Sequence, residues 1–340
     1  MAFINKLLKQ KALAQRLVAQ LSRNLNKIND EMQTAVESII NRKAIRTQED
    51  LNELSKAVNN VLRSDVMDQA IADTLAELKD FAVLEADQLD RTFSAPLGNN
   101  EVKSLSKDAV ASIVAKSQYE NRTTEQWLKR YATKSKDEIM KLARFARAQG
   151  LDSRELANLM VGTEDFNYKD GLFNKRMHAA KTTARTAMNA IATKTQQDFY
   201  KQNKDVIEGE QILVTLDGRT SIICAAYSER NETFKVGEAP RPPFHPNCRS
   251  LIVPKLKEKF ERRIGDSSRR AASGDKGGTQ VPRNQSYDTF LRAQSAEFQR
   301  EALGETKYKL FSKGVKLDKF VDNDKPISAK ALAQKYKDLI

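Results

Sequence analysis

Apolar residues recur every three or four positions along the first 90 residues. The clearest run consists of Leu17, Leu21, Leu25, Ile28, Met32, Val36 and Ile39. This spacing puts the side chains on one face of an α-helix. No proline or glycine precedes Pro96, so little in this region interrupts a helix. We therefore expect residues 1–93 to form a helical arm or bundle.

A second helix is expected to begin at Thr47. The Thr47 hydroxyl can cap a helix that carries Glu49 and Asp50 in its first turn. Its own apolar stripe follows, and isolated stripes must pack against something. The pattern leaves two alternatives open, a hairpin or bundle whose stripes cover each other, and an arm that binds a partner protein.

The pattern predicts a loop over residues 94–100, where Pro96 and Gly98 lie, and then a helical lead-in over 104–200. Within the lead-in, Gly150 should end one helix and Ser153 should begin the next. This loosely resembles a helix-turn-helix, but no row of base-reading side chains follows, which favours a plain packed hairpin.

Strand-like alternation appears only after residue 200. Gln211–Leu216 and Ser250–Val253 predict two short strands within a small α+β core over 201–254. Residues 286–340 read as a helical C-terminal extension, with one helix from Ser286 to Lys309 and a last helix from about Ser328. The expected fold is mainly α with a small α+β domain, in which long N-terminal helices and a helical lead-in precede a short-stranded core.

The net charge points to a polyanionic partner. The 340 residues include 58 Lys and Arg against 45 Asp and Glu, a formal charge of +13, and the length suggests two or three domains. Residues 255–285 are especially basic and read as a flexible linker, either a solvated loop or a contact for phosphates. The candidate nucleic-acid contacts are Lys255, Lys257, Lys259, Arg262, Arg263, Arg269 and Arg270.

Several function classes are disfavoured by composition. No apolar run approaches the roughly 20 residues that cross a bilayer, and no secretion signal is recognisable at the N-terminus, so synthesis in a cytoplasm, without an address signal, is expected. Two cysteines are too few for a disulfide scaffold. With two histidines in the chain, most histidine-based chemistry is excluded.

The most informative segment is Val214–Pro254. Thr220 and Ser221 can cap a short helix, and the proline-rich stretch 242–249 presents its side chains in a defined geometry. Cys224, His245 and Cys248 would supply three zinc ligands, whereas a structural zinc site normally has four. Position 221 holds serine, and Asp217 would have to replace the missing ligand. We therefore expect a metal-free, hydrogen-bonded turn, with bound zinc as the alternative.

Cysteine-protease chemistry is a further candidate for this turn. His245 and Cys248 are too close in sequence, on a proline-constrained turn, to form the usual base and nucleophile.

The same segment resembles the phage Mu F-like head morphogenesis family, the minor head proteins of tailed bacteriophages, which also include a phage SPP1 protein. The residues that carry the resemblance are Asp217, Arg219, Thr220, Cys224, Pro243, His245, Pro246, Asn247, Cys248 and Arg249. Weaker similarity extends over about 120–330. Many relatives have a cysteine where this chain has Ser221, and the first hundred residues match nothing in the family.

The resemblance implies a virion protein rather than an enzyme. Such proteins associate with the portal inside the capsid and aid head assembly and DNA packaging or ejection. The implied partners are the portal protein, the major capsid or scaffold protein, and double-stranded DNA bound without sequence preference. The implied location is the interior of the head, after assembly in the host cytoplasm. The motif turn is expected to be structural, with no catalytic residue and no cofactor.

Two other readings compete with this one. Domains of this family are sometimes fused to toxin or ADP-ribosyltransferase modules, which would make the chain an enzyme. The sequence has no glycine-rich phosphate loop, no His-Glu-x-x-His and no serine elbow. A non-virion, host-encoded DNA-binding protein would instead recognise specific sequences, yet no aromatic-interleaved basic groove is visible.

Overall fold

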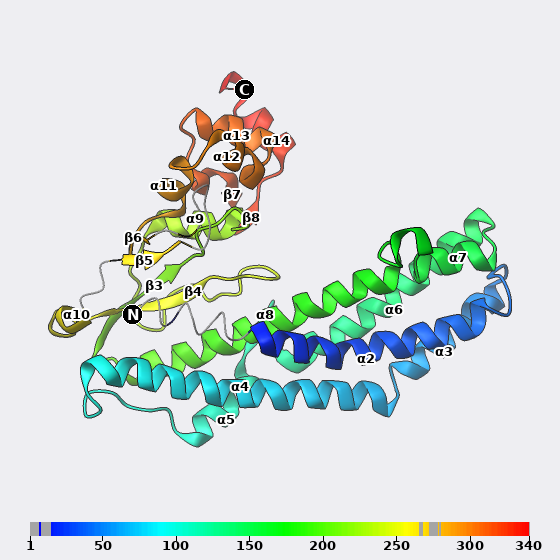
Figure 1. Ribbon diagram of the computed structural model, residues 1–340, viewed down its shortest axis with the longest axis horizontal. Helices are drawn as coiled ribbons and strands as arrows, with labels where there is room; N and C mark the ends of the chain where they lie inside the picture. The colour runs from blue at the N-terminus through cyan, green and yellow to red at the C-terminus, as the bar shows by residue number, and fades with distance from the viewer. Residues whose placement is uncertain (1–6, 8–14, 265–267, 272–277, 279, 340) are drawn as a thin grey trace. The chain divides into compact units, whose positions relative to one another are not determined.

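The structure is a computed structural model that describes residues 7, 15–264, 268–271, 278 and 280–339 (Figure 1). The chain is mainly α with a small α+β part, as the sequence predicts. Its helices are α2 (Gln15–Ile40), α3 (Gln48–Val61), α4 (Asp65–Leu97), α5 (Lys107–Lys116), α6 (Thr124–Gln149), α7 (Ser153–Met160), α8 (Leu172–Gln202), α9 (Ile222–Arg230), α10 (Glu258–Ile264), α11 (Tyr287–Arg292), α12 (Ala296–Leu303), α13 (Glu305–Ser312) and α14 (Ala329–Lys335).

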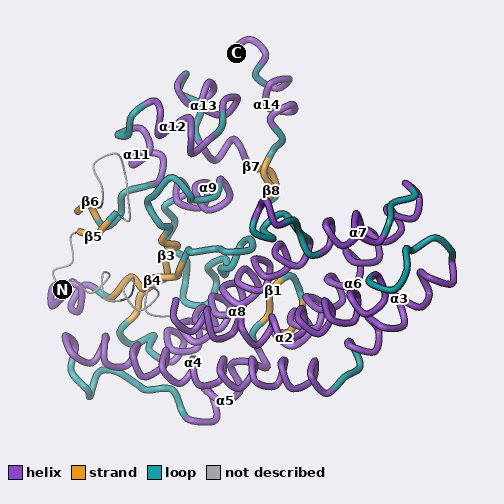
Figure 2. The backbone as a smooth tube through the Cα atoms, turned by 45° about the vertical axis from the view of Figure 1, so that its right-hand side comes forward, coloured by secondary structure: helices purple, strands orange, loops and turns teal. Residues whose placement is uncertain are grey.

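The strands are short and pair two by two (Figure 2). They are β1 (Gln118–Tyr119), β2 (Arg122–Thr123), β3 (Ile207–Leu213), β4 (Leu251–Leu256), β5 (Ser268–Arg270), β6 (Gln280–Pro282), β7 (Val321–Asp322) and β8 (Lys325–Pro326). Single 3₁₀ turns lie at Glu164–Phe166, Leu317–Phe320 and Lys337–Leu339. Among the described residues, no helix is long and apolar enough to span a membrane.

The chain forms two compact units that do not follow the five consecutive segments expected from the sequence. One, here called the bundle unit, comprises residues 14–82 and 111–191. The other, the mixed unit, comprises 1–13, 83–110 and 192–340 and contains the longest strand pair. Each unit therefore combines stretches that lie far apart in the sequence.

The N-terminal stripe is buried inside the bundle unit. Leu25, Ile28 and Met32 of α2 are all 0% exposed, in a core shared with α3, α6, α7 and the start of α8. Burial of this stripe within its own unit supports the bundle alternative, because a partner-binding arm would have to expose it.

The predicted helix ends in this unit are confirmed. The Asp50 backbone N–H donates to Thr47 Oγ1 at 3.1 Å, and the Thr47 N–H donates to Asp50 Oδ2 at 2.7 Å, which completes a capping box. Gly150 adopts the left-handed conformation with φ 68°, where glycine meets no steric cost, and ends α6. Helix α7 then begins at Ser153, capped by Asp152.

The loop predicted over residues 94–100 begins later than expected. Helix α4 continues through Pro96 to Leu97. Phe93 and Leu97 are both buried in the core of the mixed unit, and their burial holds the last turn in helical form although proline cannot donate a backbone hydrogen bond there.

Strands β3 and β4 form an antiparallel pair whose side chains lie in the core of the mixed unit. Leu213 pairs with Leu251 and Ile207 with Leu256, with a register shift next to Gly209. The predicted first strand is displaced, since β3 begins at Ile207 rather than Gln211. The acidic and glycine residues at 208–210 look like a turn, but Glu210 is buried and paired with Arg241 at 2.7 Å.

The mixed unit has a second core, which lies between the end of β3, α9 and the C-terminal helices. This second core includes Cys224 and Cys248. The single helix expected over Ser286–Lys309 is instead three short ones, because Ser295 caps α12 and Gly304 ends it. The last helix starts as predicted, with Ser328 capping α14. The basic segment 255–285 contains α10, β5 and β6, so its described part includes regular structure.

Candidate functional site: a buried cysteine–histidine cluster beside helix α9

Helix α9 positions the first cysteine. Ser221 is its N-cap, and Ser221 Oγ accepts the Cys224 backbone N–H at 3.2 Å. Cys224 therefore lies in the first turn of the helix, with its side chain in the second core. Ser221 acts here as the predicted cap.

The proline-rich turn positions the second cysteine and the histidine. The Cys248 N–H donates to the His245 carbonyl at 3.1 Å, which closes a tight turn. Asn247 occupies the left-handed region with φ 61°, a conformation that asparagine tolerates better than most residues. Phe244 stacks on Tyr227 of α9 with ring centroids 4.2 Å apart, so the turn is fastened directly to that helix.

An ion pair ties the two halves of the motif together. The Arg249 guanidinium donates to both carboxylate oxygens of Asp217, with Nη2–Oδ1 at 2.7 Å. The same carboxylate accepts the Arg219 N–H at 3.0 Å and the Thr220 hydroxyl at 3.3 Å. Tyr287 Oη donates to the Asp217 carbonyl at 2.8 Å. These contacts hold the motif together. Because both carboxylate oxygens of Asp217 accept hydrogen bonds from Arg249, Asp217 does not serve as a metal ligand here.

Burial alone would raise the pKa of Asp217. The hydrogen bonds and positive charge of Arg249 outweigh burial and lower that pKa below its ordinary value. The same pairing raises the pKa of Arg249. Both groups are therefore charged at neutral pH.

The two cysteines and the histidine meet in one place. Cys224 Sγ lies 3.1 Å from His245 Nε2 and 3.8 Å from Cys248 Sγ. The potential ligand atoms of the three residues all lie within 4.8 Å of one another. Both cysteines are 3% exposed, and His245 is half-buried. The structure thus assembles the three residues that the sequence marked as potential zinc ligands.

The protonation of this cluster follows from its surroundings. The adjacent Cys248 thiol and burial together raise the pKa of Cys224 well above its ordinary value. Burial opposes protonation of His245, but the Cys248 thiol and the Pro246 carbonyl outweigh it and raise the pKa of the imidazole. A buried thiol with a raised pKa is a poor nucleophile, which argues against cysteine-protease chemistry at Cys224.

Sequence reasoning missed two residues of this site. Ser250 Oγ donates to Cys224 Sγ at 3.1 Å, and Tyr287 reaches Asp217 from the C-terminal extension. The position of Ser250, two residues after Cys248 and directly before β4, was a usable signal. Nothing local to Tyr287 indicates a contact with a residue 70 positions earlier.

The basic candidates separate into two groups. Lys257, Lys259, Arg262 and Arg263 are exposed, whereas Lys255 is half-buried and pairs with Glu208 at 3.5 Å. Arg269 is 2% exposed, and its guanidinium donates to the carbonyls of Val214 and Gln285 at 2.7 and 2.8 Å. The expectation that Arg269 contacts phosphates is therefore corrected, because its charge is directed into the protein. The side chain of Arg270 lies outside the described residues.

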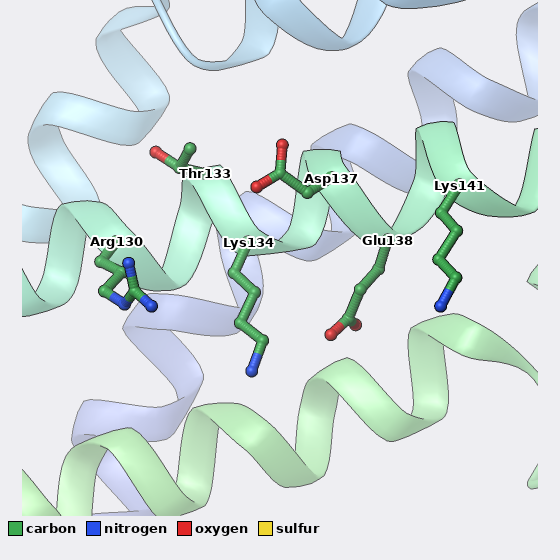
Figure 3. A pocket seen from close by; sticks show the side chains of 6 residues that line it. All are labelled: Arg130, Thr133, Lys134, Asp137, Glu138 and Lys141. Carbon is green, nitrogen blue, oxygen red and sulfur yellow. The ribbon is translucent and has the colours of Figure 1, made fainter.

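A shallow cavity of about 290 Å³ lies on the bundle unit. Its lining residues all come from α6: Arg130, Thr133, Lys134, Asp137, Glu138 and Lys141. Figure 3 shows Lys134, Glu138 and Lys141 pointing from α6 toward a neighbouring helix. Glu138 is already paired with Arg176 at 3.2 Å, and the mixture of charges along one helix face is typical of a solvated surface.

No protein-family model, no curated protein and no solved structure matches this chain.

Proposed function

We propose that this chain is a minor head protein of a tailed bacteriophage, associated with the portal inside the capsid. The observation that carries the proposal is the convergence of the motif. Asp217, Cys224, His245, Cys248 and Arg249 come from two separated stretches and form two neighbouring sets of contacts, the Asp217–Arg249 ion pair and the Cys224–His245–Cys248 cluster. We expect the motif residues to come together in this way if the resemblance to the head morphogenesis family reflects a shared fold rather than chance similarity of sequence.

The N-terminal stripe is buried, so the portal must bind other side chains that are exposed. Phe166 and Tyr168 are 64% and 53% exposed, between α7 and α8. Their loop is held by Thr163, whose N–H and hydroxyl donate to Asp170 at 2.9 and 2.8 Å. Two aromatic rings displayed by an ordered loop lose little entropy on binding, which suits a protein contact.

Non-specific contact with DNA falls to the exposed lysines of the mixed unit. Lys103 pairs with Asp205 at 2.5 Å, and Lys257 and Lys259 are close enough to lower the pKa of that carboxylate further. Three lysines around one exposed carboxylate leave a local excess of positive charge. Such a patch binds phosphates without reading bases, and its affinity falls steeply with salt.

The test is a pull-down with the portal protein encoded in the same genome, at low and high salt, with and without duplex DNA. We expect portal binding that survives high salt, and DNA binding that does not. Absence of portal binding together with tight, sequence-selective DNA binding would favour a host DNA-binding protein. A catalytic activity on host protein, without portal binding, would favour a toxin-like enzyme.

A paired variant locates the portal contact. The double substitution Phe166→Gln with Tyr168→Asn should weaken portal binding at least about tenfold, since exposed aromatic anchors dominate interfaces. Asparagine suits position 168, where φ is 58°. The matched control is Leu84→Gln, which removes an equally exposed apolar side chain (58%) from the mixed unit. Equal losses in both variants would show that this loop is not the contact.

A further inference from the structure

The cysteine–histidine cluster has the composition and spacing of a metal site. Two sulfur atoms and one imidazole nitrogen converge from α9 and from the proline-rich turn, with no ligand atom more than 4.8 Å from another. Ligand atoms bound to one zinc ion are each about 2.0–2.3 Å from it, which places them within roughly 4 Å of one another. A small adjustment of the side chains would therefore admit the ion.

The tautomer of His245 is the one that a metal ligand needs. His245 Nδ1 lies 2.8 Å from the Pro246 carbonyl oxygen. A carbonyl can only accept, so Nδ1 carries the proton in the neutral ring. The lone pair is then on Nε2, the atom that faces Cys224 Sγ at 3.1 Å. Histidines that bind metals commonly have their other nitrogen bonded to a carbonyl in this way.

The cysteines also have outer partners typical of metal-bound sulfur. The Ser250 hydroxyl donates to Cys224 Sγ at 3.1 Å. Arg249, held by Asp217, is close enough to interact electrostatically with both cysteines. Hydrogen-bond donors and positive charge around sulfur are the kind of outer partners that surround metal-bound thiolates.

We propose that Cys224, His245 and Cys248 bind one zinc ion through two thiolates and Nε2, with the fourth coordination position open. Sulfur and nitrogen ligands select zinc over magnesium or calcium. Binding displaces the two thiol protons into solvent and involves no change of oxidation state. Among the described residues, these three form the only group of potential metal ligands. Asp217 is bonded to Arg249, and Ser221 caps α9.

Position 221, the N-cap of α9, is the place to engineer a fourth ligand. Ser221 is three residues before Cys224, and its hydroxyl is within hydrogen-bond distance of the Cys224 backbone. A cysteine at position 221 would complete the Cys-x-x-Cys spacing of four-ligand zinc sites. This inference concerns the cluster alone and stands whether or not the chain is a virion protein.

The experiment titrates the full-length protein, stripped of metal and kept reduced with a phosphine, with Zn²⁺ and separately with Co²⁺. We expect one ion per chain, and with Co²⁺ the absorption bands of a tetrahedral site with thiolate ligands. Cys224→Ser and His245→Asn should each lower the Zn²⁺ affinity at least about a hundredfold. The matched control, His178→Asn, removes the chain's other histidine, which is exposed on α8, and should leave the affinity unchanged.

A gain-of-function variant separates metal binding from loss of fold. Ser221→Cys keeps all three native ligands and should raise the Zn²⁺ affinity at least about tenfold, an effect that unfolding cannot produce. The proposal is overturned if the reduced wild-type protein takes up no stoichiometric Zn²⁺. It is equally overturned if Cys224→Ser and His245→Asn bind Zn²⁺ as tightly as the wild type, or if Ser221→Cys gains no affinity.

Discussion

At the scale of single residues, the motif is a set of polar side chains that satisfy one another. The sequence indicated which residues matter, and the structure shows why two of them are charged. Asp217 is almost completely buried, a position in which a carboxylate needs compensation, and Arg249 supplies it through two parallel hydrogen bonds. This pairing could not be derived from spacing, because the two residues lie 32 positions apart.

Asp217→Asn should destabilise the mixed unit by about 2–3 kcal/mol, since it leaves the Arg249 charge without a partner. The expected loss lies at the low end for a broken buried pair because the Arg249 side chain is 33% exposed. Urea unfolding at neutral pH measures the loss. The control is Glu258→Gln, which breaks the exposed Arg262–Glu258 pair on α10 and should leave the midpoint unchanged.

The destabilisation caused by Asp217→Asn should depend on pH. The folded-state pKa of Asp217 is lowered, so the stability that its ionised form contributes is complete above the ordinary aspartate pKa of about 4. It is lost as the pH falls from there through the lowered value. The stability difference between wild type and Asp217→Asn should therefore shrink below about pH 4. A difference that stays constant down to pH 2 would contradict the charged pair.

At the scale of elements, periodicity located the long helices well and the short elements less well. The stripe through Leu25 and the cap at Thr47 depend on local sequence, and both appear as expected. The extension of α4 through Pro96 depends on burial of Phe93 and Leu97 in a core built from distant segments. The early start of β3 depends on the Arg241–Glu210 pair. Neither tertiary effect has a local signature.

One buried amide joins elements that are distant in the chain. Asn203, 1% exposed just after α8, accepts the Lys103 N–H at 2.7 Å and donates to the Lys103 carbonyl at 2.9 Å. Its amide also donates to the Phe199 carbonyl at 2.9 Å. The Asn203 side chain thus supplies hydrogen-bond partners for both the N–H and the carbonyl of Lys103.

Asn203→Asp should destabilise the mixed unit by about 2–3 kcal/mol, because a carboxylate faces two carbonyl oxygens that it cannot serve as a donor. Hydrogen exchange at the Lys103 amide should accelerate in parallel. The neighbouring change Gln202→Glu is the matched control, because Gln202 makes an exposed bond to the Ser104 carbonyl. Comparable losses in both variants would show that the buried amide has no special role.

At the scale of the whole molecule, the two units have different expected roles. The sequence presented the N-terminal stripe as a candidate partner surface, yet its side chains form the core of the bundle unit. The exposed aromatic side chains at positions 166 and 168 are our proposed partner contact, and the motif lies in the mixed unit. The interleaving of residues 14–82 with 111–191 was not predictable, because periodicity does not reveal which stripes pack together.

The most direct test of the virion role is quantitative mass spectrometry of phage heads purified from the host that carries this gene. We expect the protein in intact heads at few copies per portal ring, protected from added protease and retained with the portal after a high-salt wash. Heads that lack the protein, while it remains in the cell bound to DNA or acting on host proteins, would contradict the account.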